Sequence, residues 1–281
     1  MTSDSYLHRV VRVLSAFRAE DDELGPSELA RRTGLPKSTV HRIMQALVEE
    51  GLLERRGQEV RLGLRLFEIG QRVPRQRVLR DAALPYMADL WEATRQTIHL
   101  AVLEGTEVVY VEILHAPGGP EILHAPGGPE FPSRVGGRLP AHATGVGKAI
   151  LAFSPPEVVQ RVLEAGLSRM SGRTVAAPGL LLRELARIRR EGVAYDREES
   201  GPGIVCAAAP VLGRGGEVLG ALSASGLSTR MRPERIAPAV HTAALALSRT
   251  LGRRDRPYHT AQRALAAWYV PGVAERPPDR L

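Results

Sequence analysis

Two short amphipathic segments, joined by a glycine-containing turn and followed at once by a basic hairpin, constrain the chain more than any other feature. The first segment opens at Pro26 and stops at Thr33-Gly34, where glycine suits the left-handed end of a helix. The second, PKSTVHRIMQALVEE, repeats apolar residues three and four positions apart, as the buried face of a helix does. With the amphipathic segment over residues 6–17, this order predicts a helix-turn-helix.

The polar face of the second segment carries the residues that we expect to meet DNA, namely Lys37, Ser38, Thr39, His41, Arg42 and Gln45. The hydroxyls of Ser38 and Thr39 lie at the helix N-terminus, where the helix dipole attracts phosphates. Arg42 and Gln45 lie one turn further on, and such side chains can make two hydrogen bonds to guanine and adenine, respectively. His41 suits either a base or a phosphate. The sequence therefore predicts a recognition helix for double-stranded DNA.

The next stretch, LLERRGQEVRLG, is typical of a hairpin around Gly57, and it adds the cations Arg55, Arg56 and Arg61. Between Arg31 and Arg65 the chain has eight basic residues and four glutamates. Positive charge is thus concentrated on the helix and hairpin, as a DNA-binding surface requires. The alternative is a three-helix bundle with solvated arginines, but helix, turn, helix and basic hairpin occur together in this order more rarely than singly.

The stretch PSELARRTGLPKSTVHRIMQALVEEGLLER resembles the winged helix-turn-helix of the isocitrate lyase regulator (IclR) family of bacterial transcription factors, and the similarity continues to about Leu251. The resemblance implies a DNA-binding head, a dimerising linker helix and a C-terminal effector-binding domain of GAF-like fold. A homodimer or dimer of dimers would then bind a near-palindromic operator. The expected division is a head over 1–63, a linker over 64–93, an effector domain over 94–252 and an Arg- and Pro-rich tail over 253–281.

From Thr97 onward the apolar pattern changes from helical spacing to strands. Two hairpins, IHLAVLEG with EVVYVEIL and IVCAAAPVLG with GEVLGALSASG, are interleaved with helical segments, and the helical run PERIAPAVHTAALALSRTLG closes the domain. This pattern predicts an α+β domain with an antiparallel sheet. The segment ATGVGKA lacks the first Gly and the hydroxyl residue of a phosphate-binding P-loop, so we expect no nucleotide cofactor. Its helix N-terminus still suits an anion.

Three blocks of the C-terminal part resemble the effector domain of the IclR family: LPAHATGVGKAILA, YDREESGPGIVCAAAPV and GEVLGALSASG. The family's ligand-contacting positions fall on Gly145, Val146, Asp196, Cys206, Ser223 and Ser225. Alternation on the last strand places both serines on one face. Small polar groups beside a helix N-terminus suit a small organic acid, although Asp196 opposes an ionised carboxylate. The alternative is that these are merely small core residues.

The single cysteine, Cys206, excludes an internal disulfide and any zinc site built on paired thiolates. With His142 or His99 it could form the nucleophile of a cysteine-dependent enzyme fused to the DNA-binding head. The stretch IVCAAAPV, however, has no basic neighbour or helix N-terminus that would lower the thiol pKa. A small buried hydrophobe is the favoured interpretation, so no enzyme and no cofactor are expected.

Nine residues, Glu112 to Pro120, are repeated at once over Glu121 to Pro129. Two copies are too few for a solenoid, and His115 and His124 lack acids or thiols at ligand spacing, so no metal site is expected. A tandem duplication that lengthens a surface loop costs little, because closure entropy grows only with the logarithm of loop length. The interpretation is therefore a tolerated insertion.

The remaining composition restricts location and partners. No apolar run approaches the roughly 20 residues of a membrane-spanning helix, and the polar start MTSDSYLHR lacks the core of a secretion signal. We therefore expect a cytoplasmic protein without a membrane partner. The net charge of +7 permits an anionic partner but is weak evidence for one.

Overall fold

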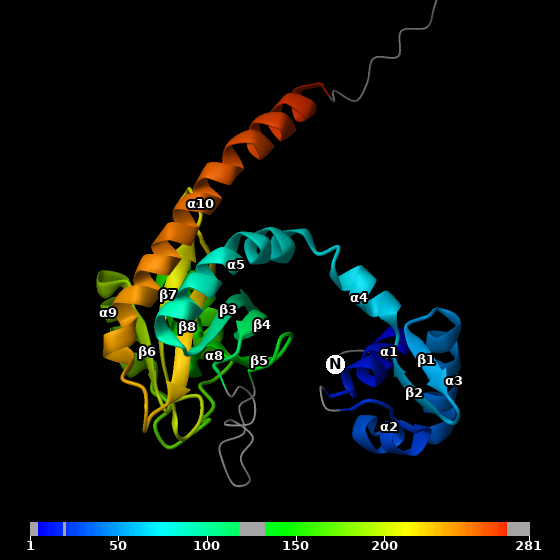
Figure 1. Cartoon of the computed structure of the whole chain (residues 1–281). Helices are drawn as coiled ribbons and strands as arrows, with labels where there is room; N and C mark the ends of the chain where they lie inside the picture. Colours follow the sequence, from blue (N-terminus) through cyan, green and yellow to red (C-terminus); the bar gives the residue numbers. More distant parts are fainter. Residues whose placement is uncertain (1–4, 19–20, 118–132, 269–281) are drawn as a thin grey trace, which may run out of the picture. The chain divides into compact units, whose positions relative to one another are not determined.

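The computed structural model describes residues 5–18, 21–117 and 133–268, with the backbone alone described for 74–76 and 254–268. The chain forms two compact units, residues 1–78 and 79–281 (Figure 1). Each unit has hydrophobic cores of its own. The finer division predicted at residues 63, 93 and 252 stays a prediction.

The first unit is a helix-turn-helix followed by a hairpin. Its elements are α1 (Tyr6–Ser15), α2 (Pro26–Thr33), α3 (Lys37–Glu49), β1 (Leu53–Arg56), β2 (Glu59–Leu62) and α4 (Leu64–Gly70). Helix α2 ends at Gly34, whose φ of 65° is a left-handed conformation that glycine adopts without strain. The strands pair antiparallel across the Gly57-Gln58 turn, and Leu24 bridges to Val60 of β2. The helix-turn-helix and the hairpin predicted from the sequence are confirmed.

A common core fixes which face of α3 points outward. Val40 and Ile43 of α3 are fully buried, together with Val13 of α1 and Leu29 of α2. Because these apolar side chains recur every three or four residues, the opposite face of α3 faces away from this core. Packing in this core therefore turns the polar face of α3 toward the outside of the first unit.

The second unit is built on a six-stranded antiparallel sheet in the order β5-β4-β3-β8-β7-β6. The strands are β3 (Thr97–Glu104), β4 (Glu107–Leu114), β5 (Arg138–Pro140), β6 (Ala194–Arg197), β7 (Ile204–Leu212) and β8 (Val218–Leu227). This arrangement confirms the predicted α+β class with an antiparallel sheet.

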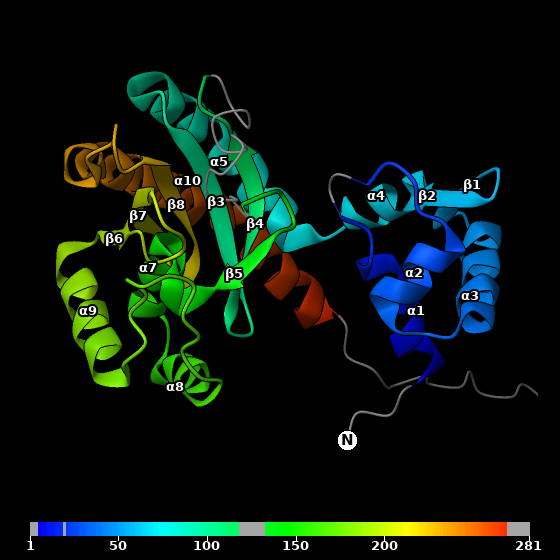
Figure 2. The same ribbon diagram turned by 90° about the horizontal axis from the view of Figure 1, so that it is seen from below.

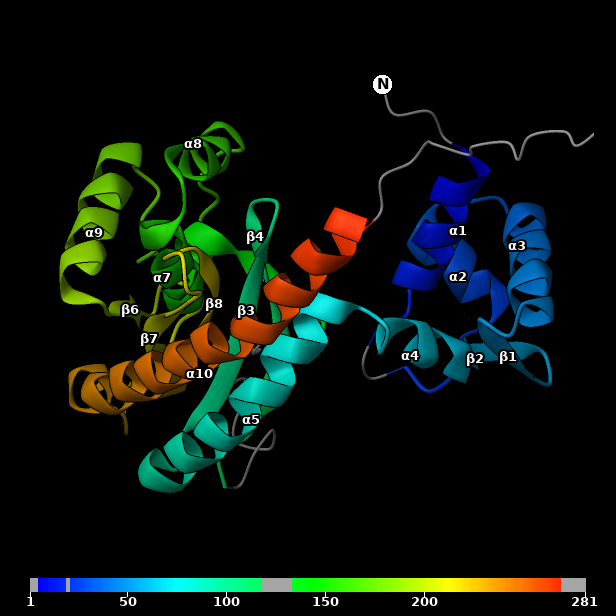
Figure 3. The same cartoon turned by 90° about the horizontal axis from the view of Figure 1, so that it is seen from above.

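Helices cover both faces of the sheet and make three layers. Helices α5 (Pro74–Thr94) and α10 (Pro233–Trp268) pack on one face (Figure 3). Helices α7 (Gly145–Phe153) and α9 (Pro178–Glu191) lie on the other face, with α8 (Pro156–Glu164) beside them (Figure 2). The short η1 (Ala141–Ala143) leads directly into α7. The residues beneath α7 are therefore enclosed between the helix layer and the sheet.

A β-bulge in β4 decides which of its side chains reach the α7 layer. Leu100 of β3 pairs with Glu112, but the next residue, Ala101, pairs with Tyr110, so Val111 is left without a partner. The extra residue breaks the alternation that would place Tyr110 and Glu112 on one face. Tyr110 packs in the core beneath α7, whereas Glu112 turns to α5 and forms an ion pair with Arg80.

Two features differ from the sequence expectation. Helix α10 continues through Gly252, where its end was predicted, because one glycine inside a helix costs only about 1 kcal/mol. Strand β6 was not predicted, since four residues are too few to show a period.

The expectation for the repeat falls partly on residues outside the described ranges. The second copy of the repeat and most of its surroundings, residues 118–132, lie outside them. The first copy enters strand β4 over Glu112 to Leu114. Among the helices of the described ranges, none is both long and apolar enough to cross a membrane.

Candidate functional site

The outer face of α3 gathers the residues predicted to meet DNA. Lys37, Ser38, His41, Arg42 and Gln45 are exposed, and Thr39 is half-buried. Pro36 precedes the helix without a side-chain cap, so the first amides of α3 stay available to an external acceptor. An exposed, uncapped helix N-terminus with small hydroxyls beside it fits a phosphate group.

Ion pairing separates the eight basic residues of this region into two groups. Four are matched by carboxylates, in the pairs Arg31–Glu28, Arg32–Asp21, Arg61–Glu54 and Arg65–Glu50. The other four make no ion pair within the described part of the chain, and these are Lys37, Arg42, Arg55 and Arg56. All four unpaired cations are exposed, on α3 or on β1. Among these eight residues, the cations without an ion pair thus lie on α3 and β1.

Arg61 differs from the other predicted DNA contacts. Its Nε and Nη2 atoms donate to Oε2 of Glu54 at 2.8 and 2.5 Å, and Arg61 is half-buried. The guanidinium in turn holds the pKa of the Glu54 carboxyl below its usual range. The two-residue turn at Gly57-Gln58 sets the register that places these residues opposite each other, so the pair could have been inferred from the sequence.

In the second unit, all six residues predicted to contact an effector line one cavity of about 30 Å³. Gly145 and Val146 begin α7, Asp196 is on β6, Cys206 is on β7, and the two serines are on β8. The register carries them across the sheet, because Asp196 pairs with Cys206, and Cys206 pairs with Ser225. His99, Tyr110 and Ser200 also line the cavity and were not predicted as ligand contacts.

The N-terminus of α7 lies directly against β7. A Cβ atom added to Gly145 would come within 2.4 Å of the Cys206 Sγ atom, so only glycine allows this approach. Thr144 caps the helix by accepting a hydrogen bond from the Gly147 amide at 3.0 Å. The amides of Gly145 and Val146, at the first two positions of the helix, have no intrahelical acceptor and remain for a ligand.

Asp196 is buried, yet both of its carboxyl oxygens accept hydrogen bonds. Oδ1 accepts from the Glu199 amide at 2.7 Å, and Oδ2 accepts from the Ser200 hydroxyl at 2.5 Å. Burial outweighs these bonds and raises the pKa of Asp196 to about 6. This carboxyl therefore changes charge close to neutral pH, beside the helix terminus that would receive an anion.

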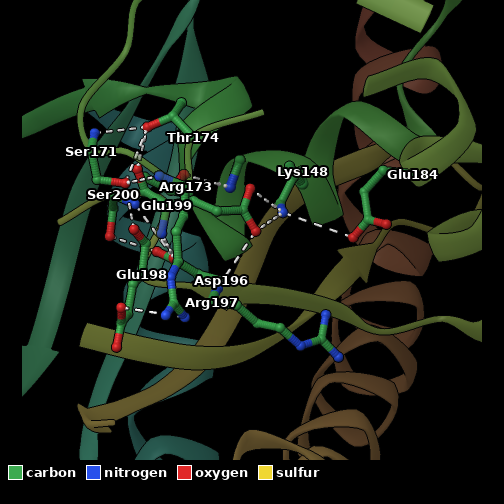
Figure 4. A network of polar contacts seen from close by, with 12 residues as sticks. Lys148, Ser171, Arg173, Thr174, Glu184, Asp196, Arg197, Glu198, Glu199 and Ser200 are labelled. Carbon is green, nitrogen blue, oxygen red and sulfur yellow. Dashed lines mark hydrogen bonds and ion pairs between the residues drawn. The ribbon is translucent and has the colours of Figure 1, made fainter. Parts of the chain in front are cut away.

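The turn that carries Asp196 is fixed from behind by a buried ion pair (Figure 4). Lys148 of α7 is fully buried, and its Nζ lies 2.6 Å from both carboxylate oxygens of Glu199. Glu184 of α9 lies 3.8 Å from the same Nζ. This pair could not be predicted from the sequence, because its members are separated by 51 residues.

A second loop holds the same turn from the other side. The Ser171 hydroxyl donates to the Glu198 carbonyl at 2.5 Å, and the Thr174 hydroxyl donates to the Glu199 carbonyl at 2.7 Å. Glu198 itself has a φ of 65°, uncommon for a residue other than glycine. The turn over 196–200 is therefore held by α7 on one side and by the 171–174 loop on the other.

Cys206 does not have the environment of a nucleophile. Burial raises the pKa of its thiol, with Asp196 adding to the effect, so the thiolate is disfavoured. Burial also lowers the pKa of His99 to about 3, and its ring hydrogen-bonds to Ser133 and Ser225. His142 bonds instead to the Ser168 carbonyl. Over the described residues, no three His, Cys, Asp or Glu side chains could hold a metal ion.

Comparison with known proteins adds two matches to protein-family models. One, described as bacterial transcriptional regulator IclR C-terminal, matches residues 71–249. The other, an IclR helix-turn-helix domain, matches residues 7–57. Among curated relatives, the HTH-type transcriptional regulators XynR and KdgR of Escherichia coli are each 32% identical, and the matches cover 88% and 91% of this chain and 96% of each relative.

Solved structures share the fold. An IclR homolog from Microbacterium hydrocarbonoxydans, complexed with 4-hydroxybenzoate, is 35% identical with a TM-score of 0.77, and the match covers 89% of this chain and 100% of that one. The Thermotoga maritima IclR is 28% identical with a TM-score of 0.70, over 88% and 98% of the two chains.

Proposed function

Since the chain belongs to the IclR family of bacterial DNA-binding transcriptional regulators, we propose that α3 is its recognition helix and that a small organic acid, bound beneath α7, controls operator binding. The observation that carries the DNA-binding part is the cluster of four exposed cations without an ion pair on α3 and β1. Free cations supply the electrostatic share of DNA affinity, because each one that neutralises a phosphate releases counterions.

Each predicted DNA contact has a role in this proposal. Arg42 and Gln45 reach base edges in the major groove, and His41 lies beside them. Lys37, Ser38 and Thr39 bind phosphates at the N-terminus of α3. Arg55 and Arg56 bind the backbone from the hairpin. Arg61 contributes less directly, because Glu54 already balances its charge, and it serves to hold the two strands together.

The effector proposal rests on the convergence of small polar groups on one buried cavity. A carboxylate would accept hydrogen bonds from the Gly145 and Val146 amides, with Ser225, the partner of Cys206 in the sheet, beside it. The Microbacterium homolog, which is complexed with 4-hydroxybenzoate, supports an organic acid as the ligand class. A cavity of about 30 Å³ holds only one or two water molecules, so the acid must widen it. A ligand that prefers the widened state shifts the population toward it.

The proposed assembly is a homodimer, or a dimer of dimers, on a near-palindromic operator. Helix α4 leaves large apolar side chains exposed, with Leu64 at 65%, Phe67 at 61% and Ile69 at 50% of full exposure. A second copy would cover such side chains. Two recognition helices in one dimer would meet half-sites separated by about one helical turn of DNA or a multiple of it. Like its DNA target, the regulator would act in the cytoplasm.

We do not propose the cysteine-dependent enzyme as a second function. The thiol of Cys206 is buried and held neutral, and the curated relatives reported above are regulators. Cys206→Ser should therefore retain DNA binding and change only the response to acids.

The proposal is tested by incubating the full chain with fragmented genomic DNA and sequencing what it retains over competitor. The wild-type chain should enrich fragments that share an inverted repeat. Arg42→Ala should lose that preference, whereas Arg31→Ala, the same change at an arginine paired with Glu28 on α2, should keep it. Retention without any shared sequence, or an equal loss in both variants, would rule out α3 as the recognition helix.

A further inference from the structure

Two buried hydroxyls on the sheet side of the cavity lack a hydrogen-bond partner within the described part of the chain. They belong to Tyr110, with 6% of its surface exposed, and Ser223, with 3%. Both residues line the cavity. The neighbouring hydroxyls are occupied, because Ser225 bonds to His99 at 3.3 Å and Ser200 to Asp196 at 2.5 Å. A buried polar group costs free energy unless it is hydrogen-bonded, so these two indicate a ligand.

The Tyr110 hydroxyl belongs to a strand remote from the helix terminus that would hold a carboxylate, and Ser223 pairs with His99, against whose ring Tyr110 packs. Gly145 rests on Cys206 of β7, whereas Tyr110 is on β4, three strands away in the sheet order. Neighbouring strands are about 4.8 Å apart, so β4 and β7 are about 14 Å apart across the sheet. The tyrosine side chain spans part of this gap. A ligand that reaches both groups needs a polar atom at each end, which an acid without a further oxygen, such as benzoate, does not provide.

We propose that Tyr110 and Ser223 form a second binding pole of the cavity, an inference that rests on the proposed function. This pole selects carboxylic acids that carry a hydroxyl or carbonyl oxygen at the end remote from the carboxylate. The β-bulge at Val111 makes this pole possible, because it turns Tyr110 toward α7. The Tyr110 ring is also fixed against His99, with 5.2 Å between the ring centroids. Its phenol stays protonated, because burial raises its pKa, and it can therefore donate a hydrogen bond.

The test compares acids that differ in one oxygen, 4-hydroxybenzoate against benzoate and 4-hydroxyphenylacetate against phenylacetate, by isothermal titration calorimetry on the full-length protein. Tyr110→Phe should weaken the binding of the hydroxylated acid of each pair by about three- to tenfold, the range for one neutral hydrogen bond. The Kd for the acid without the hydroxyl should not change. Ser223→Ala should act in the same direction. Without ligand, Tyr110→Phe should not lower the Tm, because its hydroxyl has no partner to lose.

Tyr86→Phe is the matched control. The Tyr86 hydroxyl bonds to Thr250 at 2.5 Å and is outside the cavity, so this variant should lower the Tm and leave the discrimination between acids intact. Equal weakening of both members of a pair by Tyr110→Phe, or no weakening of either, would overturn the second pole. If no acid of either pair binds the wild type while operator selection succeeds, the proposed ligand class fails and the second pole with it, but the DNA-binding role stands.

Discussion

Gly145→Ala tests the packing that brings the N-terminus of α7 against β7. The added Cβ would lie 2.4 Å from the Cys206 Sγ atom, closer than two such atoms can approach, while Ala208 Cβ and the Asp196 amide nitrogen are at an ordinary 3.5 Å. Overpacking of a core costs about 1–3 kcal/mol. Replacing glycine by alanine in a helix returns at most about 1 kcal/mol. The free energy of unfolding should therefore fall by about 1–2 kcal/mol.

Both tryptophans of the chain lie in the second unit, so urea unfolding followed by tryptophan fluorescence reports on that unit alone. Cys206→Ala removes the sulfur atom that the new methyl group meets. In that background, Gly145→Ala should cost close to nothing, which makes the coupling energy of the double-mutant cycle about as large as the original loss.

Two other glycines provide controls for this cycle. Gly179, near the start of α9, has no atom within 4 Å of an added Cβ, so Gly179→Ala should not destabilise. An added Cβ at Gly147 would meet the Ala141 backbone oxygen at 2.1 Å, and Cys206→Ala should not rescue that variant. The proposed contact between α7 and β7 would be refuted if Gly145→Ala were as stable as the wild type, or if Cys206→Ala did not restore the stability that Gly145→Ala loses.

Three further predictions concern charge. Arg55→Ala should weaken binding to specific and to random DNA alike, and it should reduce the salt slope of binding, measured by anisotropy, by about 1. Arg61→Ala should change this slope less, because Glu54 already balances the charge of Arg61. The affinity for the carboxylic acid, measured by calorimetry, should fall as the pH rises through about 6, because Asp196 is neutral below that pH and repels an anion above it. Asp196→Asn should remove this pH dependence. Lys148→Met should destabilise by about 3–5 kcal/mol in urea, and added Glu199→Gln should restore much of this.

Each of these three predictions has a result that would contradict it. A larger salt-slope change for Arg61→Ala than for Arg55→Ala would mean that the ion pair with Glu54 opens on DNA. A pH dependence that persists in Asp196→Asn would assign it to another group. Lys148→Met with unchanged stability would show that the buried pair does not hold the turn over 196–200.

The DNA-binding head could be predicted because its determinants are local. The spacing of Val40 and Ile43, the glycine at Gly34 and the turn at Gly57 all lie within forty residues and each fixes its own element. Period and turn chemistry are signals that single sequences carry well. The convergence of the six effector residues on one cavity was expected from family resemblance rather than from the residues alone.

The features that could not be predicted depend on pairing between distant segments. The bulge that turns Tyr110 toward the cavity is visible only in the register of β3 and β4. Lys148 and Glu199 meet only after α7 packs on the sheet, and burial, which raises the pKa of Asp196, is likewise a product of packing. None of these leaves a local pattern in the sequence, because each is created by tertiary packing.

The most direct test of the account is the coupling between the two proposed sites. With an operator fragment obtained by selection and an acid that binds, anisotropy gives the Kd for DNA with and without acid, and calorimetry gives the Kd for acid with and without DNA. Each ligand should change the Kd of the other by the same factor, as linkage requires of an effector-controlled regulator. An acid that occupies the cavity and leaves operator affinity unchanged would contradict it.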